Sequence, residues 1–239
     1  MTTVLIGLDD TDNADSRGTG YLARRLSAEC VRRGMRPLGV TRHQFLMDPR
    51  IPYTSHNSGA CVAVACERDE TEAAFAFEFV AGAAAQGSDP GVCLARLDAV
   101  TTASVAFGRE ATRRIVGMAE AFDAARGGAI ALRALGGSGL GIIGALGSVA
   151  LRAEGREGRF IDLVGLRDLS DRVKVDAFER LGIGLAHESG RTPGPDDVYE
   201  TLGWVRPRLV DGRPALPVGW DEERHAWLPV DRKRTRPLE

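Results

Sequence analysis

An acidic segment near the N-terminus has the residue types and spacing with the clearest chemistry. An apolar run over residues 4–8 leads directly into Asp9, Asp10 and Asp12, so three carboxylates follow within four positions. Carboxylates this close raise one another's pKa unless a cation lies among them, and Mg²⁺ takes such oxygens together with substrate phosphates. An acidic turn exposed to solvent would contain the same residue types. The segment therefore predicts either a Mg²⁺ site at Asp9, Asp10 and Asp12 or an ordinary turn.

A predicted helix start follows within ten residues. Gly18 comes directly before an amphipathic pattern over residues 19–33, and Thr19 is its first residue. Because the free amides of a helix N-terminus attract anions, we expect a phosphate to contact Gly18 and Thr19. Thr19 would also serve as a plain N-cap, worth about 1 kcal/mol.

A glycine-rich turn links a predicted strand to a predicted helix at residues 136–144. Glycine has no Cβ, so the backbone amides of such a turn can approach an anion closely. We expect phosphate contacts from Gly137, Ser138, Gly139 and Gly141.

The same turn fits the dinucleotide fingerprint. Glycines stand at 139, 141 and 144, and Asp162 follows 18 residues after Gly144. A ribose-binding acid should end its strand, whereas the predicted strand 159–165 continues beyond Asp162, and the chain lacks a plain run of βαβ repeats. An NAD- or FAD-dependent oxidoreductase is therefore the third-ranked function.

Two histidines and one polar strand start are weaker candidates. His43 and His56 have no accompanying serine or cysteine elbow, so we interpret them as structural or substrate-contacting. Ser58 and Gly59 open a predicted strand with small groups, which alone indicates an ordinary loop.

Composition excludes several classes of protein. The 239 residues include 31 basic and 33 acidic side chains, with 44% apolar and 27% charged residues. A net charge of −2 argues against a protein whose whole surface attracts a nucleic acid or an anionic membrane. The proportions of apolar and charged residues are typical of a folded protein. No apolar stretch approaches the roughly 20 residues of a membrane span, and the N-terminus has no basic signal region, so a cytoplasmic protein without a membrane partner is predicted.

Lysine and cysteine usage narrows the chemistry further. Lys174 and Lys233 are the only lysines, and neither follows a glycine run, so a Walker A loop is excluded. The four cysteines form no Cys-x-x-Cys pair, which favours small buried thiols over zinc ligands or disulfides. They are Cys30, Cys61, Cys66 and Cys93.

The strands and helices expected from the sequence pattern alternate along the chain, which indicates an α/β or α+β fold. Strands are expected at 3–8, 38–45, 60–66, 92–97, 129–135 and 159–165, and helices at 19–33, 71–85, 109–125, 141–153 and 171–181. The last segment, 182–239, differs in kind, because seven of the eleven prolines and all three tryptophans lie between Pro193 and Pro237. We expect short hairpins there, one around Asp211-Gly212 and one between Trp220 and Trp227, followed by a solvated basic tail.

Several short motifs in a fixed order resemble the archaeal family of 2-agmatinylcytidine synthetases that modify an isoleucine tRNA. These motifs are GLDDTD (7–12), TGYL (19–22), DPRIPY (48–53), SGA (58–60), GSGLGIIGAL (137–146) and DLVGLR (162–167).

The resemblance implies a two-lobed protein with a kinase-like, ATP-binding lobe (1–58 and 129–181), a ferredoxin-like lobe (59–128) and a β-rich C-terminal appendage (182–239). It also implies that ATP is held with Mg²⁺, that Thr19 occupies the place of a phosphorylated threonine, and that the γ-phosphoryl group activates a carbonyl-type oxygen which an amine then displaces. The nucleotide contacts implied are Gly18, Thr19, Ser58, Gly59, Gly137, Ser138, Gly139, Gly141 and Arg167.

The chain also departs from the family pattern. Gly20 replaces the second of two paired threonines, and Ser138 and Leu140 replace an asparagine and an arginine in the glycine turn. His56 and Ser58 replace the arginine and asparagine before the third strand. The tRNA-binding OB-fold and the zinc ribbon are expected to be missing, since 182–239 contains no cysteine and too few predicted strands.

The function predicted is therefore ATP- and Mg²⁺-dependent phosphoryl transfer to a small carbonyl, amide or nucleobase-like acceptor, by a chain that does not modify tRNA by itself. The alternative is a non-catalytic nucleotide-binding module whose C-terminal segment contacts a protein partner or a second copy of the chain.

Overall fold

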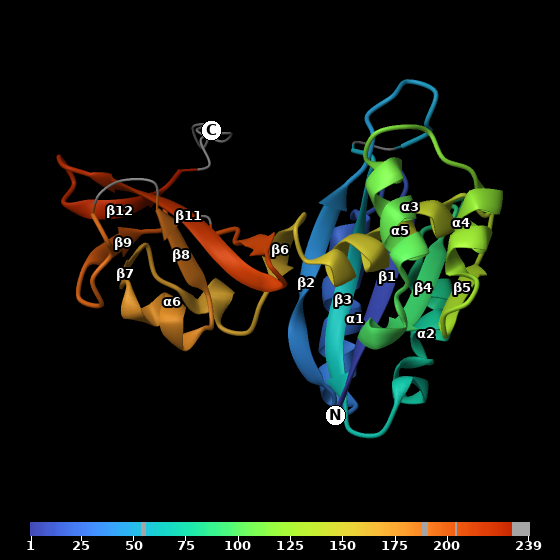
Figure 1. Cartoon of the computed structure of the whole chain (residues 1–239), viewed down its shortest axis with the longest axis horizontal. Coiled ribbons are helices and arrows are strands. Elements are labelled where there is room, and N and C mark those ends of the chain that lie inside the picture. Colours follow the sequence, from blue (N-terminus) through green and yellow to red (C-terminus); the bar gives the residue numbers. More distant parts are fainter. Residues whose placement is uncertain (54–55, 188–190, 204, 231–239) are drawn as a thin grey trace.

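The computed structural model describes residues 1–53, 56–187, 191–203 and 205–230, which form a larger and a smaller lobe joined at β6 (Figure 1). The strands are β1 (Thr2–Asp9), β2 (Arg36–Gln44), β3 (Ser58–Cys66), β4 (Gly91–Arg96), β5 (Ile130–Ala134), β6 (Arg159–Asp162), β7 (Arg172–Lys174), β8 (Gly184–His187), β9 (Val198–Glu200), β10 (Arg208–Val210), β11 (Arg213–Asp221) and β12 (Ala226–Pro229). The α-helices are α1 (Thr19–Arg32), α2 (Ala76–Ala83), α3 (Thr102–Ala111), α4 (Met118–Ala125), α5 (Gly141–Glu154) and α6 (Asp176–Arg180), with 3-10 turns at Glu70–Ala73, Leu97–Ala99 and Leu166–Asp168.

One sheet runs through both lobes in the order β5-β4-β1-β3-β2-β6-β10-β11-β12-β9-β7, and β8 pairs with β11. The expected α+β, two-lobed fold is confirmed. No helix within the described residues has both the length and the apolar character of a membrane span.

The first half of the chain forms a βαββαβ unit. Its four strands pair antiparallel in the order β4-β1-β3-β2, which is the ferredoxin-like arrangement. This unit spans residues 2–96, whereas the family resemblance predicted a ferredoxin-like lobe at 59–128. The difference arises because β1 hydrogen-bonds to β3 on one side and to β4 on the other, so strands from both expected lobes share one sheet.

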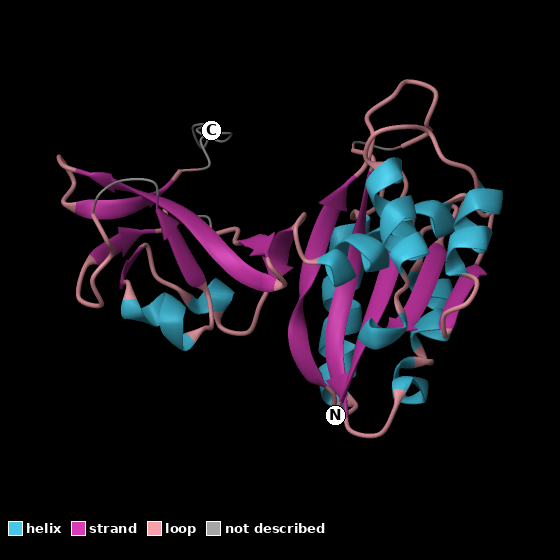
Figure 2. Cartoon of the chain, in the orientation of Figure 1, coloured by secondary structure: helices cyan, strands magenta, loops and turns pink. Residues whose placement is uncertain are grey.

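Helices cover both faces of this part of the sheet (Figure 2). On β1, Val4, Ile6 and Leu8 pack in the cluster that contains α1 and α2, whereas Leu5 packs in the cluster that contains α5. Because successive side chains of a strand point to opposite faces, a strand buried on both faces is apolar throughout. The acidic segment therefore follows directly after a strand that is held in place by packing on both of its faces.

Glycines allow α5 to lie unusually close to the sheet. A Cβ at Gly7 would lie 2.0 Å from the carbonyl oxygen of Ala145, and a Cβ at Gly91 would lie 2.1 Å from the carbonyl carbon of Gly141. Both clashes are with backbone, which cannot rotate away. Gly7 and Gly91 therefore serve the contact between helix and sheet.

Three of the expected helices are shorter than predicted. The segment 109–125 contains the end of α3 and all of α4, separated by a break that ends at Gly117, the N-cap of α4. The segment 71–85 contains a 3-10 turn and α2, and 171–181 contains β7 and the short α6.

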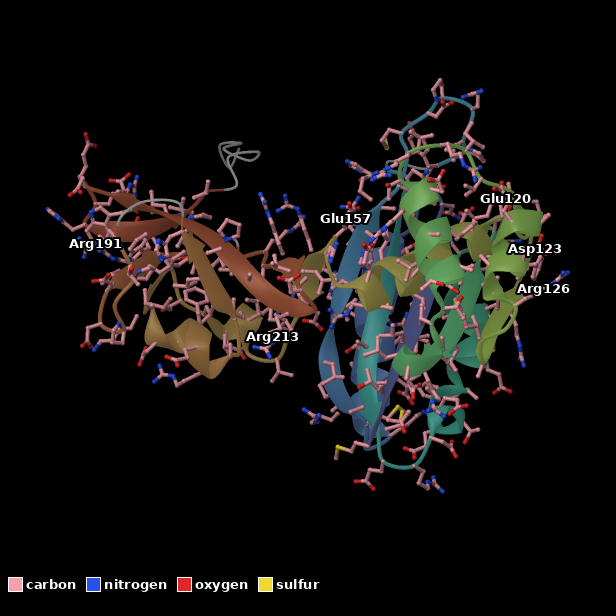
Figure 3. The ribbon with its side chains drawn as sticks, viewed as in Figure 1. Glu120, Asp123, Arg126, Glu157, Arg191 and Arg213 are labelled. Carbon is pink, nitrogen blue, oxygen red and sulfur yellow. The ribbon has the colours of Figure 1, made fainter. Side chains whose placement is uncertain are left out.

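The smaller lobe has its own apolar core. Phe178 of α6 packs edge-on against Tyr199 of β9, with ring centroids 4.8 Å apart, and Trp227 is fully buried beside them. The contact between Phe178 and Tyr199 crosses the expected limit at 181/182. Arg191 lies over the ring of Trp220 at 3.5 Å, at the outer end of this lobe (Figure 3).

Both expected hairpins are confirmed. Asp211 and Gly212 have φ of +46° and +77° between β10 and β11, which suits a tight turn with two left-handed residues, and β11 pairs with β12. The expectation of too few strands in 182–239 is wrong, because β8 to β12 all lie in this segment, and residues of β8, β9, β11 and β12 share a core with Phe178 of α6. Strands of three or four residues are too short for a periodic sequence signal. The predicted basic tail at 232–236 lies outside the described residues.

Candidate functional site

Asp9 ends β1 and lies between that strand and α5. A Cβ at Gly144 would lie 1.8 Å from Asp9 Oδ2, so the carboxylate occupies space that only glycine leaves open. Burial, and to a lesser degree repulsion from Asp10 and Asp12, raises the pKa of Asp9 to about 7, although a hydrogen bond from the amide of Asp10 opposes the rise. A cation beside Asp9 would favour its charged form.

Asp10 adopts a left-handed backbone conformation, with φ of +51°, which Asp and Asn tolerate better than most residues. The pKa of Asp10 is raised first by burial and then by repulsion from Asp89 and Asp12, while a hydrogen bond from the amide of Asp89 lowers it. Asp89 is thus a fourth carboxylate at this end of the sheet, and no motif in the sequence had pointed to it.

Asp12 holds the start of α1 through Thr19. The Thr19 hydroxyl donates to Asp12 Oδ1 at 2.8 Å, and the Thr19 amide donates to the same oxygen at 3.1 Å. Thr19 Oγ1 accepts from the Thr11 hydroxyl at 3.0 Å and from the Thr11 amide at 3.3 Å, and both threonines are buried. Gly18 is the N-cap and Thr19 is the first helical residue, so Thr19 is not a plain cap. The amide expected to bind a phosphate instead donates to a carboxylate of the chain.

The glycine turn is built around Asp89. The Ser138 hydroxyl and the Gly139 amide both donate to its carboxylate, the latter at 3.2 Å. Gly137 and Gly139 have φ of +57° and +84°, and a Cβ at Gly137 would overlap Asp89 Oδ1. Gly141 packs against the backbone of Asp89, where a Cβ would lie 2.2 Å from the carbonyl oxygen. Of the four residues predicted here, two donate to Asp89 and two pack against it.

Ser58 and Gly59 start β3 at the same end of the sheet as Asp9. Ser58 Oγ accepts from Arg42 Nε at 2.9 Å, and a Cβ at Gly59 would lie 2.4 Å from Ser148 Oγ and 3.1 Å from the carbonyl oxygen of Leu8. The antiparallel pairing of β1 with β3 brings these residues beside the acidic segment, although Gly59 has a packing role of its own.

Arg167 lies beyond the C-terminal end of β6, which points away from the end of the sheet that carries the acidic segment. Its Nη2 donates to the carbonyl oxygen of Ile161 at 3.1 Å, and its Nε lies 3.6 Å from Asp162 Oδ1. Its charge helps to lower the pKa of Arg24 on α1, after burial. These contacts place Arg167 beside β6 and α1 rather than beside the acidic segment.

His43 is a buried residue of the core. Its Nε2 lies 2.8 Å from Thr41 Oγ1, and burial with the nearby Arg152 lowers its pKa to about 3. It is neutral near pH 7 and takes a structural place, as one of the two interpretations predicted. His56 is exposed in the loop before β3. All four cysteines are buried thiols, as expected.

The topology argues against a dinucleotide site. Asp162 does end its strand, because β6 stops there, so the prediction that this strand continues to residue 165 was wrong. However, β5 and β6 are not neighbours in the sheet. Four strands, β4, β1, β3 and β2, lie between them, and every adjacent pair from β5 to β6 is antiparallel. The fingerprint requires neighbouring parallel strands joined by the helix, so the glycine turn is not part of a dinucleotide-binding unit.

The carboxylates at this end of the sheet do not make up a complete metal site by themselves. Within the described residues, no group of three or more His, Cys, Asp or Glu side chains is arranged to hold a metal ion. Mg²⁺ commonly takes only one or two carboxylates and completes its shell with water and substrate phosphates. Burial first, and then repulsion among the carboxylates, raises the pKa values of Asp9 and Asp10, and a cation beside them would favour their charged forms.

Comparisons with known proteins relate the fold to one group of enzymes. No family model matches the chain, and no curated protein matches it. Among solved structures, the chain is similar to a tRNA fluorescent labeling enzyme (25% identity, TM-score 0.54, 62% of this chain and 36% of that one). It is also similar to apo TiaS, an isoleucine-tRNA agmatidine synthetase (22%, 0.53, 62% and 35%), and to TiaS in a complex with its tRNA and ATP (24%, 0.54, 63% and 36%).

The protein therefore has a TiaS-like fold, which confirms the resemblance predicted from the motifs. The match spans about a third of the length of those structures.

Proposed function

We propose that this protein binds ATP with Mg²⁺ at the carboxyl end of β1 and transfers the γ-phosphoryl group to an oxygen of a carbonyl, amide or nucleobase-like acceptor. The observation that carries the proposal is the set of carboxylates there, with Asp9 seated against α5 and its pKa raised to about 7. Support comes from the TiaS-like fold, since one structure of that enzyme is a complex with ATP and another is a complex with AMPCPP and agmatine.

In this proposal Asp9, Asp10 and Asp12 hold Mg²⁺ through one or two carboxylates at a time. When bound, the ion neutralises charge on the phosphates. Gly18, Ser58, Gly59 and the turn 137–141 contact the nucleotide, whereas Arg167 has no part in this proposal, because its contacts place it beside β6 and α1. The acceptor oxygen forms a bond to the γ-phosphorus while the bond to ADP breaks, and an amine then displaces the phosphorylated oxygen with release of phosphate.

Thr19 is the proposed protein phosphoacceptor. Its hydroxyl already donates to Asp12 Oδ1, so the carboxylate can take the proton as the Thr19 oxygen bonds to the γ-phosphorus and the bond from that phosphorus to ADP breaks, in an autophosphorylation separate from transfer to the small acceptor. Burial of Thr19 requires the α1 start to open toward the nucleotide before transfer.

Calorimetry with Mg·ATP tests the proposal. Asp10→Asn should weaken binding at least tenfold, about 1.4 kcal/mol, and Asn suits the left-handed backbone there. Asp12→Asn should also weaken binding at least tenfold. Asp98→Asn is the matched control, because Asp98 is exposed and pairs with Arg96 at the opposite end of β4. Equal affinities in all variants would refute the metal assignment.

Turnover separates an enzyme from a binding module. An enzyme should release ADP faster when small amines and amides are added, whereas a non-catalytic module should bind ATP without releasing ADP under any of these conditions.

A further inference from the structure

Asp89 lies between the acidic segment and the glycine turn, and each of its polar groups contacts one of them. Its amide lies close enough to the carboxylate of Asp10 to lower the pKa of that group, and its carboxylate accepts from Ser138 and Gly139. Its carbonyl oxygen lies against Gly141, the first residue of α5. A displacement of Asp89 would therefore disturb both halves of the candidate site.

The loop that carries Asp89 is tied to both sides by further hydrogen bonds. The Ala85 amide donates to the carbonyl oxygen of Thr11 at 2.9 Å, and Asn13 Nδ2 donates to that of Gln86 at 3.1 Å. On the other side, the Leu135 amide donates to the carbonyl oxygen of Pro90 at 2.8 Å. The loop thus holds its position relative to the acidic segment and to the start of the turn.

A partner outside the turn would favour one of the conformations that its glycines allow. Glycine loses more conformational freedom on ordering than any other residue, and this turn has left-handed glycines on both sides of Ser138. Hydrogen bonds to a charged acceptor are stronger than neutral ones, so a carboxylate is well suited to select one conformation. The backbone also wraps so closely that Gly137 has no room for a Cβ beside Asp89.

We propose that Asp89 is a positioning residue that holds the glycine turn in the conformation that contacts the phosphates of ATP. It acts through Ser138 and Gly139 and not as a phosphate contact itself, because its own charge is negative. This inference rests on the proposed binding of ATP.

A double-mutant cycle on Mg·ATP affinity tests the inference. Asp89→Ala should weaken binding at least tenfold, and Ser138→Ala should weaken it a few-fold because Gly139 remains bonded. The double variant should bind no more weakly than Asp89→Ala alone, since Ser138 acts through Asp89. Asp89→Asn should lie between wild type and Asp89→Ala, because its amide oxygen can accept one of the two hydrogen bonds.

The outcomes separate this inference from the proposed function. If the wild type does not bind ATP, both fail. If it binds ATP and Asp89→Ala binds equally well, or the two single effects add, Asp89 does not position the turn and ATP binding stands. If Asp89→Ala does not fold, Asp89→Asn and Ser138→Ala decide, and wild-type affinity in both would overturn the inference.

Discussion

Replacing Gly144 with alanine should move the Asp9 carboxylate without changing any charge in the site. The new methyl group would lie 1.8 Å from Asp9 Oδ2, 2.5 Å from its Cγ and 2.9 Å from its Cβ. Rotation of the side chain can relieve the first two contacts but leaves the third in place. We therefore expect Asp9 to turn away from α5 and the helix to shift by a few tenths of an ångström.

The energetic consequence follows from two opposing effects. Alanine in a helix interior is favoured over glycine by about 1 kcal/mol, whereas overpacking of a close contact costs about 1–3 kcal/mol. Gly144→Ala should therefore lower the free energy of unfolding by up to about 2 kcal/mol. Gly82→Ala is the matched control on α2, because no atom beyond its chain neighbours and its own helix backbone lies within 4 Å of the added Cβ, and it should gain up to about 1 kcal/mol.

Urea unfolding and Mg·ATP calorimetry on both variants measure the effect. Affinity should fall at least tenfold in Gly144→Ala and stay unchanged in Gly82→Ala. A Gly144→Ala protein that is more stable than wild type and binds Mg·ATP normally would show that Asp9 does not need this position, and the site assignment would be wrong.

Two further predictions concern buried groups of the same lobe. When the pH falls from 7 to 5, His43 should lower the free energy of unfolding by about 2 kcal/mol, because its pKa is about 3 in the folded protein and 6.5 in the unfolded chain, which therefore binds the proton first. Urea unfolding of a His43→Gln variant at the two pH values should show a loss of stability about 2 kcal/mol smaller than that of the wild type. Equal losses in the two proteins would contradict a buried, neutral His43. Thr19→Val should cost about 1–3 kcal/mol, because the buried Thr11 and the half-buried Asp12 lose their hydrogen bonds to its hydroxyl. With γ-labelled ATP, mass spectrometry should find phosphate on wild-type Thr19 and none in the variant, and an unlabelled wild type would limit Thr19 to a structural role.

Features set by short stretches of chain were predictable from the sequence. The apolar run before Asp9 predicts a strand that ends in carboxylates, and β1 has that form. Asp211-Gly212 predicts a hairpin turn, and both residues have positive φ. In each case neighbouring residues alone determine the backbone conformation, so no distant part of the chain is needed.

Features that depend on strand pairing were decided only by the tertiary structure. Asp89 reaches Asp10 because Gly91 of β4 pairs with Asp9 of β1, and no periodic pattern relates positions about 80 residues apart. Likewise, glycines at 141 and 144 fit a phosphate-binding or dinucleotide-binding spacing, yet in the fold they admit the backbone of Asp89 and the carboxylate of Asp9. The sequence by itself determined which groups end β1 and turn the chain at 211–212. The tertiary structure decided which groups share the site, through hydrogen bonds between strands that are distant in the sequence. Paired strands bring the residues at their ends together, however long the chain that connects them.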